Sequence, residues 1–155
     1  MRQTKTRYET DRRIPTGGVR NVRPRRIKLD KFDLEYTAAD ECTGKVVLEW
    51  SPDDAHVGTA TADQSLRGHL RCGAEAAAEA LELASGGRVD LEVLAVTAME
   101  GFDTVLVIVA LKSDAAEINE RLSGSCMIKG HPPKSAAMAV LDATNRLYGH
   151  ALQVA

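Results

Sequence analysis

The feature that most restricts the possible fold is a duplicated pattern of three strand-like stretches followed by one helix. In the first copy, the segment KVVLEWSPDDAH is followed by the helical segment AEAAAEALELA. In the second copy, TVLVIVALKSDA and PKSAAMAVLDA occupy the corresponding positions. The residue-by-residue similarity is weak, but the order and lengths of the segments agree. A duplicated β-β-β-α unit predicts an α+β fold in which antiparallel sheet is covered by two helices.

Hydrophobic periodicity places the expected elements. Alternation with period two indicates half-buried strands, and a helical period indicates amphipathic helices. The alternation shifts near Lys31, which indicates a β-bulge or a bend. One helix is expected from Cys72 to just before Gly86, and the other from Pro132 until Gly149 ends it. The expected strands cover residues 27–36, 45–50, 57–63, 89–98, 104–111 and 121–129.

Length and composition fit one domain with tails. The 155 residues include few aromatic side chains, so the expected core is aliphatic and rich in alanine. The N-terminus has no apolar segment typical of a secretory signal, and the longest apolar run, Val105 to Leu111, is too short to span a bilayer. We therefore expect a cytoplasmic protein with reduced cysteines and no membrane contact. The expected organisation is a flexible basic arm over 1–25, an α+β domain over 26–151 with halves 26–86 and 87–151, and a tail over 152–155.

Positive charge is concentrated at the N-terminus. Residues 1–31 contain eleven Lys and Arg against three acidic residues, a net charge of +8, while the remainder carries −10. A basic arm on an acidic body indicates an anionic partner. That partner is either nucleic acid or the acidic body of a neighbouring subunit, and a solvated tail without a specific partner is the alternative. The contact residues expected in the arm are Arg12, Arg13, Arg20, Arg23, Arg25 and Arg26.

Catalytic chemistry is not indicated. The sequence contains none of the motifs of the common hydrolases, metalloproteases or nucleotide-binding enzymes, so we expect no catalytic residues and no enzyme activity. His69 and Cys72 have the spacing of two metal ligands, and Cys126 with His131 would complete a four-ligand site. The alternative is that both cysteines are small buried side chains near the strand–helix junctions. We expect neither a metal nor a cofactor, because a single H-x-x-C is weak support for a structural metal site.

The two junctions between a third strand and the following helix are the best candidates for a binding site. The first is LRGHLRCG at 66–73, and the second combines SGS at 123–125 with GHPP at 130–133. Helix N-termini attract carboxylates and phosphates through free N–H groups, and glycine allows close approach. The alternative is that the glycines only form turns. The expected ligand-binding residues are Gly68, His69, Arg71, Gly73, Gly124 and His131, with Arg71 as the carboxylate partner.

The second half also carries short motifs of a known family. In chain order they are VDLEVLAVTA, the Asp103 segment, TVLVIVAL, RLSGSC and the helix ending ATNRL at 143–147. They resemble the C-terminal regulatory (allosteric dimerisation) domain of 2-isopropylmalate synthases and citramalate synthases. The resemblance covers residues 27 to 149 and implies a duplicated β-β-β-α unit that pairs as a homodimer, with a ligand at or near the pairing surface.

Two parts of that family are missing from this chain. The family's first helix follows a G-x-G-x-G-P loop, where this chain has GHLRCG at 68–73. The catalytic barrel with its metal-binding H-x-H motif is absent, so the chain resembles a stand-alone regulatory module. The resemblance therefore implies a non-catalytic, homodimeric regulatory or ligand-binding module that senses a small carboxylate or an amino acid. The alternative is a nucleic-acid-binding or adaptor protein that acts through the basic arm.

Overall fold

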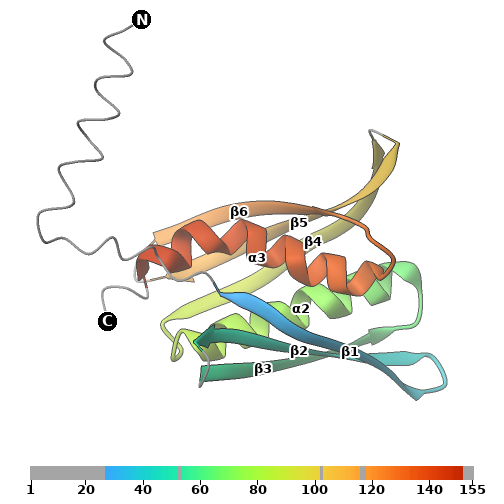
Figure 1. Ribbon diagram of the computed structural model, residues 1–155, viewed down its shortest axis with the longest axis horizontal. Coiled ribbons are helices and arrows are strands. Elements are labelled where there is room, and N and C mark those ends of the chain that lie inside the picture. The colour runs from blue at the N-terminus through green and yellow to red at the C-terminus, as the bar shows by residue number, and fades with distance from the viewer. Residues whose placement is uncertain (1–26, 52–53, 102, 116–117, 152–155) are drawn as a thin grey trace, which may run out of the picture.

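Six strands and two helices make up the described part of the chain (Figure 1). The structure is a computed structural model, and it describes residues 27–51, 54–101, 103–115 and 118–151. The elements are, in chain order, β1 (Lys28–Ala38), β2 (Glu41–Ser51), β3 (Asp54–Asp63), α2 (Leu66–Ala84), β4 (Val89–Gly101), β5 (Thr104–Ala115), β6 (Ile118–Met127) and α3 (Pro132–Ala151).

The strands form two antiparallel sheets, with the orders β1-β2-β3 and β4-β5-β6. Helix α2 packs on β2 and β3 and also contacts β4, while α3 packs on β5 and β6. The two helices contact each other, and Figure 1 shows α2 between the two sheets. The predicted α+β fold with a duplicated β-β-β-α unit is confirmed, with the strands divided into one sheet for each copy.

Each copy packs its helix onto its sheet through a glycine on the third strand. Gly58 on β3 lies against the backbone of α2 at Ala76, and Gly124 on β6 lies against the backbone of α3 at Ala139. A Cβ atom at either glycine would overlap the carbonyl oxygen of that alanine. Only glycine therefore allows this close approach of helix and strand.

The close approach lets a helix carboxylate reach the open edge of each sheet. The backbone N–H of Thr59 donates to Glu79 Oε2 at 2.6 Å in the first copy. The backbone N–H of Ser125 donates to Asp142 Oδ2 at 3.1 Å in the second. Both strands are edge strands, and a side chain that binds an edge N–H removes a free donor from that edge.

These contacts fix how the two copies correspond. Ala76 is the equivalent of Ala139, and the strand residues paired with the two glycines, Val46 and Val109, are also equivalent. The alignment predicted from the sequence placed Ala76 opposite Ser135, one helical turn away, and is therefore wrong by four residues. Ala-rich helices look alike in several registers, whereas the true register is set by where each glycine meets its helix.

The first strand of each sheet has a register shift at the equivalent position. The irregularity predicted near Lys31 is confirmed, because the pairing of β1 with β2 shifts between Leu29 and Lys31. The pairing of β4 with β5 shifts between Val93 and Ala95. A local shift of this kind bends the strand and increases its twist.

Both helices extend further than predicted. Helix α2 begins at Leu66, not at Cys72, because Ser65 caps it and its hydroxyl accepts a hydrogen bond from the N–H of Gly68 at 3.0 Å. The stretch 66–73, predicted as the junction between the third strand and the helix, thus forms the first two turns of the helix. Gly149 does not end α3, which continues to Ala151.

The core is aliphatic and rich in alanine, as expected. Its largest fully buried side chains include Leu48, Leu81 and Leu111, and alanines of α2 and α3 fill the space between the layers. Among the described residues, neither helix is long and apolar enough to cross a membrane.

Candidate functional site

The first predicted junction is built by the capped end of α2. Asp63 accepts hydrogen bonds from both the N–H (2.9 Å) and the hydroxyl of Ser65. These two bonds hold the pKa of Asp63 below its ordinary value. Gly68 packs directly on the backbone of Asp63, where a Cβ would overlap the carbonyl oxygen. Protein groups therefore already occupy the helix end that was expected to receive a ligand.

The second junction meets the first where the two helices touch. Gly73 of α2 lies against Pro133 of α3, and a Cβ at Gly73 would overlap the carbonyl oxygen of Pro133. The structure thus brings the two predicted junctions together at one end of the helix pair. The glycine at this point serves helix–helix contact.

The two predicted histidines, one from each junction, each lie against an aromatic ring of β1. The ring of His69 is 5.9 Å from that of Tyr36, and the ring of His131 is 5.4 Å from that of Phe32 in an edge-on arrangement. The Nε2 atom of His69 is buried and has no hydrogen-bond partner in the part of the chain that the structure describes. Tyr36 is 64% exposed, so this surface is open to solvent.

Two other predicted ligand-binding residues lie away from the helix contact. Gly124 is under the middle of α3 and packs on that helix. Arg71 lies on the side of α2 that faces β4. The structure therefore gathers Gly68, His69, Gly73 and His131 around the two helix ends, and separates Gly124 and Arg71 from them.

Arg71 lines an open groove with a volume of about 470 Å³. Helix α2 forms its floor, and the edge strands β3 and β4 form its two sides. This volume is within the range of small-molecule sites. The lining residues are Thr59, Ala60, Thr61, Arg71, Glu75, Ala78, Glu79, Glu82, Leu91, Glu92 and Val93.

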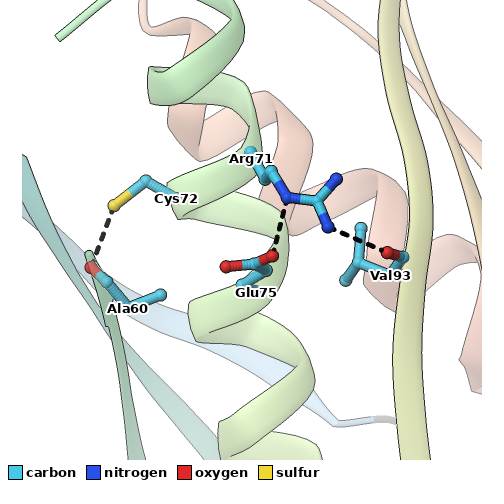
Figure 2. Close-up of polar contacts among 5 residues, drawn as sticks. All are labelled: Ala60, Arg71, Cys72, Glu75 and Val93. Carbon is cyan, nitrogen blue, oxygen red and sulfur yellow. Dashed lines mark hydrogen bonds and ion pairs between the residues drawn. The ribbon is translucent and has the colours of Figure 1, made fainter. Parts of the chain in front are cut away.

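Two contacts hold the guanidinium of Arg71 across this groove (Figure 2). Arg71 Nε pairs with Glu75 Oε1 at 2.8 Å, one helical turn along α2. Arg71 Nη2 donates to the carbonyl oxygen of Val93 on β4 at 3.2 Å. The contacts orient the guanidinium plane, and Nη1 has no partner among the described residues.

Glutamates of α2 bind both strand edges. Glu79 accepts from Thr59 on β3, and Glu82 Oε1 accepts from the N–H of Leu91 on β4 at 2.8 Å. With Glu75, helix α2 lines the groove with three carboxylates and a single guanidinium. A purely anionic ligand would be repelled by this excess of negative charge.

The position of Glu82 has a consequence for its ionisation. Burial raises the pKa of Glu82 above the ordinary value of 4.5, the N–H of Leu91 lowers it in part, and Asp90 and Glu79 raise it further. A carboxyl with a raised folded-state pKa binds its proton more tightly in the folded chain than in the unfolded chain. The contribution of Glu82 to stability is therefore lost as the pH rises from about 4.5 through the folded-state pKa.

We expect Glu82→Gln to stabilise the protein at pH 7 relative to wild type, and not at pH 4. Glutamine keeps an oxygen for the Leu91 N–H and carries no charge to desolvate. The gain should be less than about 1 kcal/mol, because the groove is open to solvent. Urea unfolding at both pH values measures it, with the exposed Glu35→Gln as the control. A gain that is equal at both pH values would contradict the assignment.

Of the two cysteines expected to be buried, Cys72 is buried and Cys126 is only half-buried. Cys72 is buried, and its thiol donates to the carbonyl oxygen of Ala60 at 3.1 Å (Figure 2). Burial, with the neighbouring Cys42, raises the pKa of Cys72 to about 12, so the thiol stays protonated. Among the described residues, no group of three His, Cys, Asp or Glu side chains is placed to hold a metal ion.

Of the residues that line the groove, only Arg71 is predicted from the sequence to bind a ligand. Glu75, Glu79 and Glu82 follow the helical period on the side opposite the apolar stripe, which predicts a solvated face. The local signal that was present is their spacing, together with Arg71 four residues before Glu75. That spacing does not indicate that two sheet edges lie beside the helix.

No protein-family model and no curated protein matches this chain. The resemblance to regulatory domains therefore rests on its own short motifs. The predicted arm contacts, Arg12, Arg13, Arg20, Arg23, Arg25 and Arg26, lie outside the described residues.

Proposed function

We propose that the protein is a non-catalytic regulatory module that acts as a homodimer and binds a small amino acid in the groove between β3, α2 and β4. The observation that carries this proposal is the position of Arg71, whose Nη1 is unpaired within the described residues in a groove that glutamates of α2 also line. The resemblance of the second half to the regulatory domains of 2-isopropylmalate and citramalate synthases supports the same class.

The charges of the groove favour a zwitterion over a simple carboxylate. An α-carboxylate has a partner in Arg71, which can add a hydrogen bond through Nη1. The excess carboxylates of α2 disfavour an anion but suit an ammonium group. A ligand with both groups satisfies the two sets of side chains at once.

The remaining lining suits a small apolar side chain. Leu91 and Val93 are buried at one side of the groove, Ala60 lies on the other side, and Ala78 is on the floor between them. A site lined by aliphatic side chains with a few placed polar groups is typical of small-ligand binding.

A thermal-shift panel tests the proposal. We expect aliphatic amino acids to raise the melting temperature, and the matching 2-oxo acids, which lack the ammonium group, to have no effect. A ligand at a hundred times its dissociation constant should add about 2.7 kcal/mol to the free energy of unfolding. Equal shifts with both classes, or no shift with any compound, would reject the amino-acid site.

We expect Arg71→Met to reduce this ligand-induced shift to about half or less at the same ligand concentration, because methionine keeps much of the aliphatic stem and removes the carboxylate partner. Loss of a charged hydrogen bond typically lowers affinity by about 1.5–3 kcal/mol. The matched control is Arg67→Met, one turn earlier on α2, exposed and outside the groove. The same shift in Arg71→Met and wild type would show that the ligand binds elsewhere, with the helix ends near His69 and His131 as the next place to examine.

A nucleic-acid-binding or adaptor protein acting through the basic arm is the second candidate. The net charge of +8 on residues 1–31 favours it. This candidate predicts that the protein binds RNA or DNA with an affinity that falls as the salt concentration rises. Deletion of residues 1–26 should abolish that binding.

A further inference from the structure

Each sheet turns one face to the helices and the other away from them. On the second sheet, the outward residues form three consecutive cross-strand rows over β4, β5 and β6. We call these rows the outer face of the second sheet. The rows are Met99–Leu106–Met127, Thr97–Ile108–Ser125 and Ala95–Ala110–Ser123.

The duplication provides an internal comparison for this face. The correspondence of Gly58 with Gly124 assigns each row a twin on the first sheet. Where the second sheet carries Met, Leu, Ile and Ala, the first carries mainly charged residues and threonine. The twin rows are Glu35–Thr43–Thr61, Asp33–Lys45–Thr59 and Lys31–Val47–Val57.

The first sheet has the composition of a sheet that faces water, and the second does not. Antiparallel sheets with one solvated face alternate apolar inward and polar outward residues. On the second sheet, Met99 is 52% exposed, Met127 is 50% exposed and Leu94, at the register shift, is 39% exposed. A contiguous apolar patch on one side of the described fold marks an interaction surface.

We propose that the outer face of the second sheet is where two copies of this chain pair, sheet against sheet. The inference rests on the homodimeric part of the proposed function and assigns its surface. A second copy fits because the charges beside the patch complement each other. Glu92 on β4 and Arg121 on β6 stand at opposite ends of one outward row, with Lys112 between them on β5.

A two-fold axis along β5 sets Glu92 of each copy opposite Arg121 of the other, which makes two ion pairs. The same axis brings Ile108 and Leu106 of one copy into contact with Ile108 and Leu106 of the other. It also places Met99 of each copy opposite Met127 of the other. The same axis also sets Lys112 opposite Lys112 of the other copy, and Glu92 of each copy flanks this like-charge contact and offsets it. An isologous contact of this kind closes the assembly at two chains.

The sharpest test introduces the residue found at the twin position. Ile108 is equivalent to Lys45, so Ile108→Lys gives the second sheet a side chain that the same fold already carries on the first. The control is Val47→Lys, which adds the same charge to the central strand of the first sheet. Light scattering coupled to size-exclusion chromatography gives the mass of the full chain and both variants, and circular dichroism checks their folding.

We expect wild type and Val47→Lys to have the mass of two chains, and folded Ile108→Lys to have the mass of one. Glu92→Arg and Arg121→Glu should each weaken the dimer at least tenfold, and combining them should restore it. A dimeric Ile108→Lys chain would overturn the assigned surface and leave the homodimer standing. A monomeric wild type would overturn both the surface and the homodimer, while amino-acid binding in the groove would still be judged by its own thermal shifts.

Discussion

We expect Gly124→Ala to lower the free energy of unfolding by about 3 kcal/mol. The new Cβ would overlap the carbonyl oxygen of Ala139 and would lie 2.5 Å from the nitrogen and 2.8 Å from the Cβ of Ala143. These neighbours belong mainly to the helix backbone, which cannot rotate away, so the whole of α3 would have to move off β6. Overpacking of this kind typically costs about 1–3 kcal/mol, and backbone neighbours place it at the upper end.

The equivalent substitution in the first copy provides a second measurement. Gly58→Ala would push α2 off β3 at Ala76, so we expect a loss of similar size. The control is Gly101→Ala, because the added Cβ at Gly101 meets no atom within 4 Å. Urea unfolding gives all three free energies. If Gly124→Ala cost no more than Gly101→Ala, the close approach of helix and strand would be wrong.

The same close approach explains the acidic residues that border the strands. Because a glycine removes the side chain between helix and strand, Glu79 and Asp142 reach the N–H of the following strand residue. The apolar stripe and the acidic side of α2 are therefore parts of one arrangement. Small residues allow the helix to pack closely on the strand, and the neighbouring carboxylates bind backbone N–H groups at the edge of the sheet.

The fold class could be predicted because its signals are local. Alternation marked the strands, and the helical period marked α2 and α3. Even the shift near Lys31 was visible as a break in the alternation. The start of α2 could not be predicted in the same way, because the residues after Leu66 include Gly68 and Gly73, and glycine is a poor helix former. The capping side chain of Ser65 decides the start, and it acts through a hydrogen bond that composition does not reveal.

The groove could not be predicted, because it depends on contacts between distant segments. Arg71 was expected to meet a carboxylate from a ligand, and its nearest carboxylate is Glu75 of the same helix. Its second contact, Val93, belongs to the other copy of the unit. Which strand edge lies beside α2 is set by the packing of the two halves, and no residue spacing within the helix encodes that packing.

We expect Leu81→Ala to lower the free energy of unfolding by about 3 kcal/mol. Leu81 is fully buried on α2, and the buried side chains near it on that helix are alanines such as Ala77 and Ala78. Short side chains held on rigid helices cannot collapse into the space that a lost isobutyl group leaves. Leu→Ala substitutions at buried sites cost about 2–5 kcal/mol, and the cost rises with the cavity that remains.

The control lies two residues further along the same helix. Leu83 is 54% exposed, so Leu83→Ala removes the same atoms with a much smaller loss of burial, and we expect a change below about 1 kcal/mol. Helix propensity affects both variants equally, so the difference between the two unfolding free energies isolates the core contribution. A difference of less than about 1 kcal/mol would mean that the Ala-rich layer repacks around the gap, and that its alanines are not held as closely as the glycine contacts of β3 and β6 require.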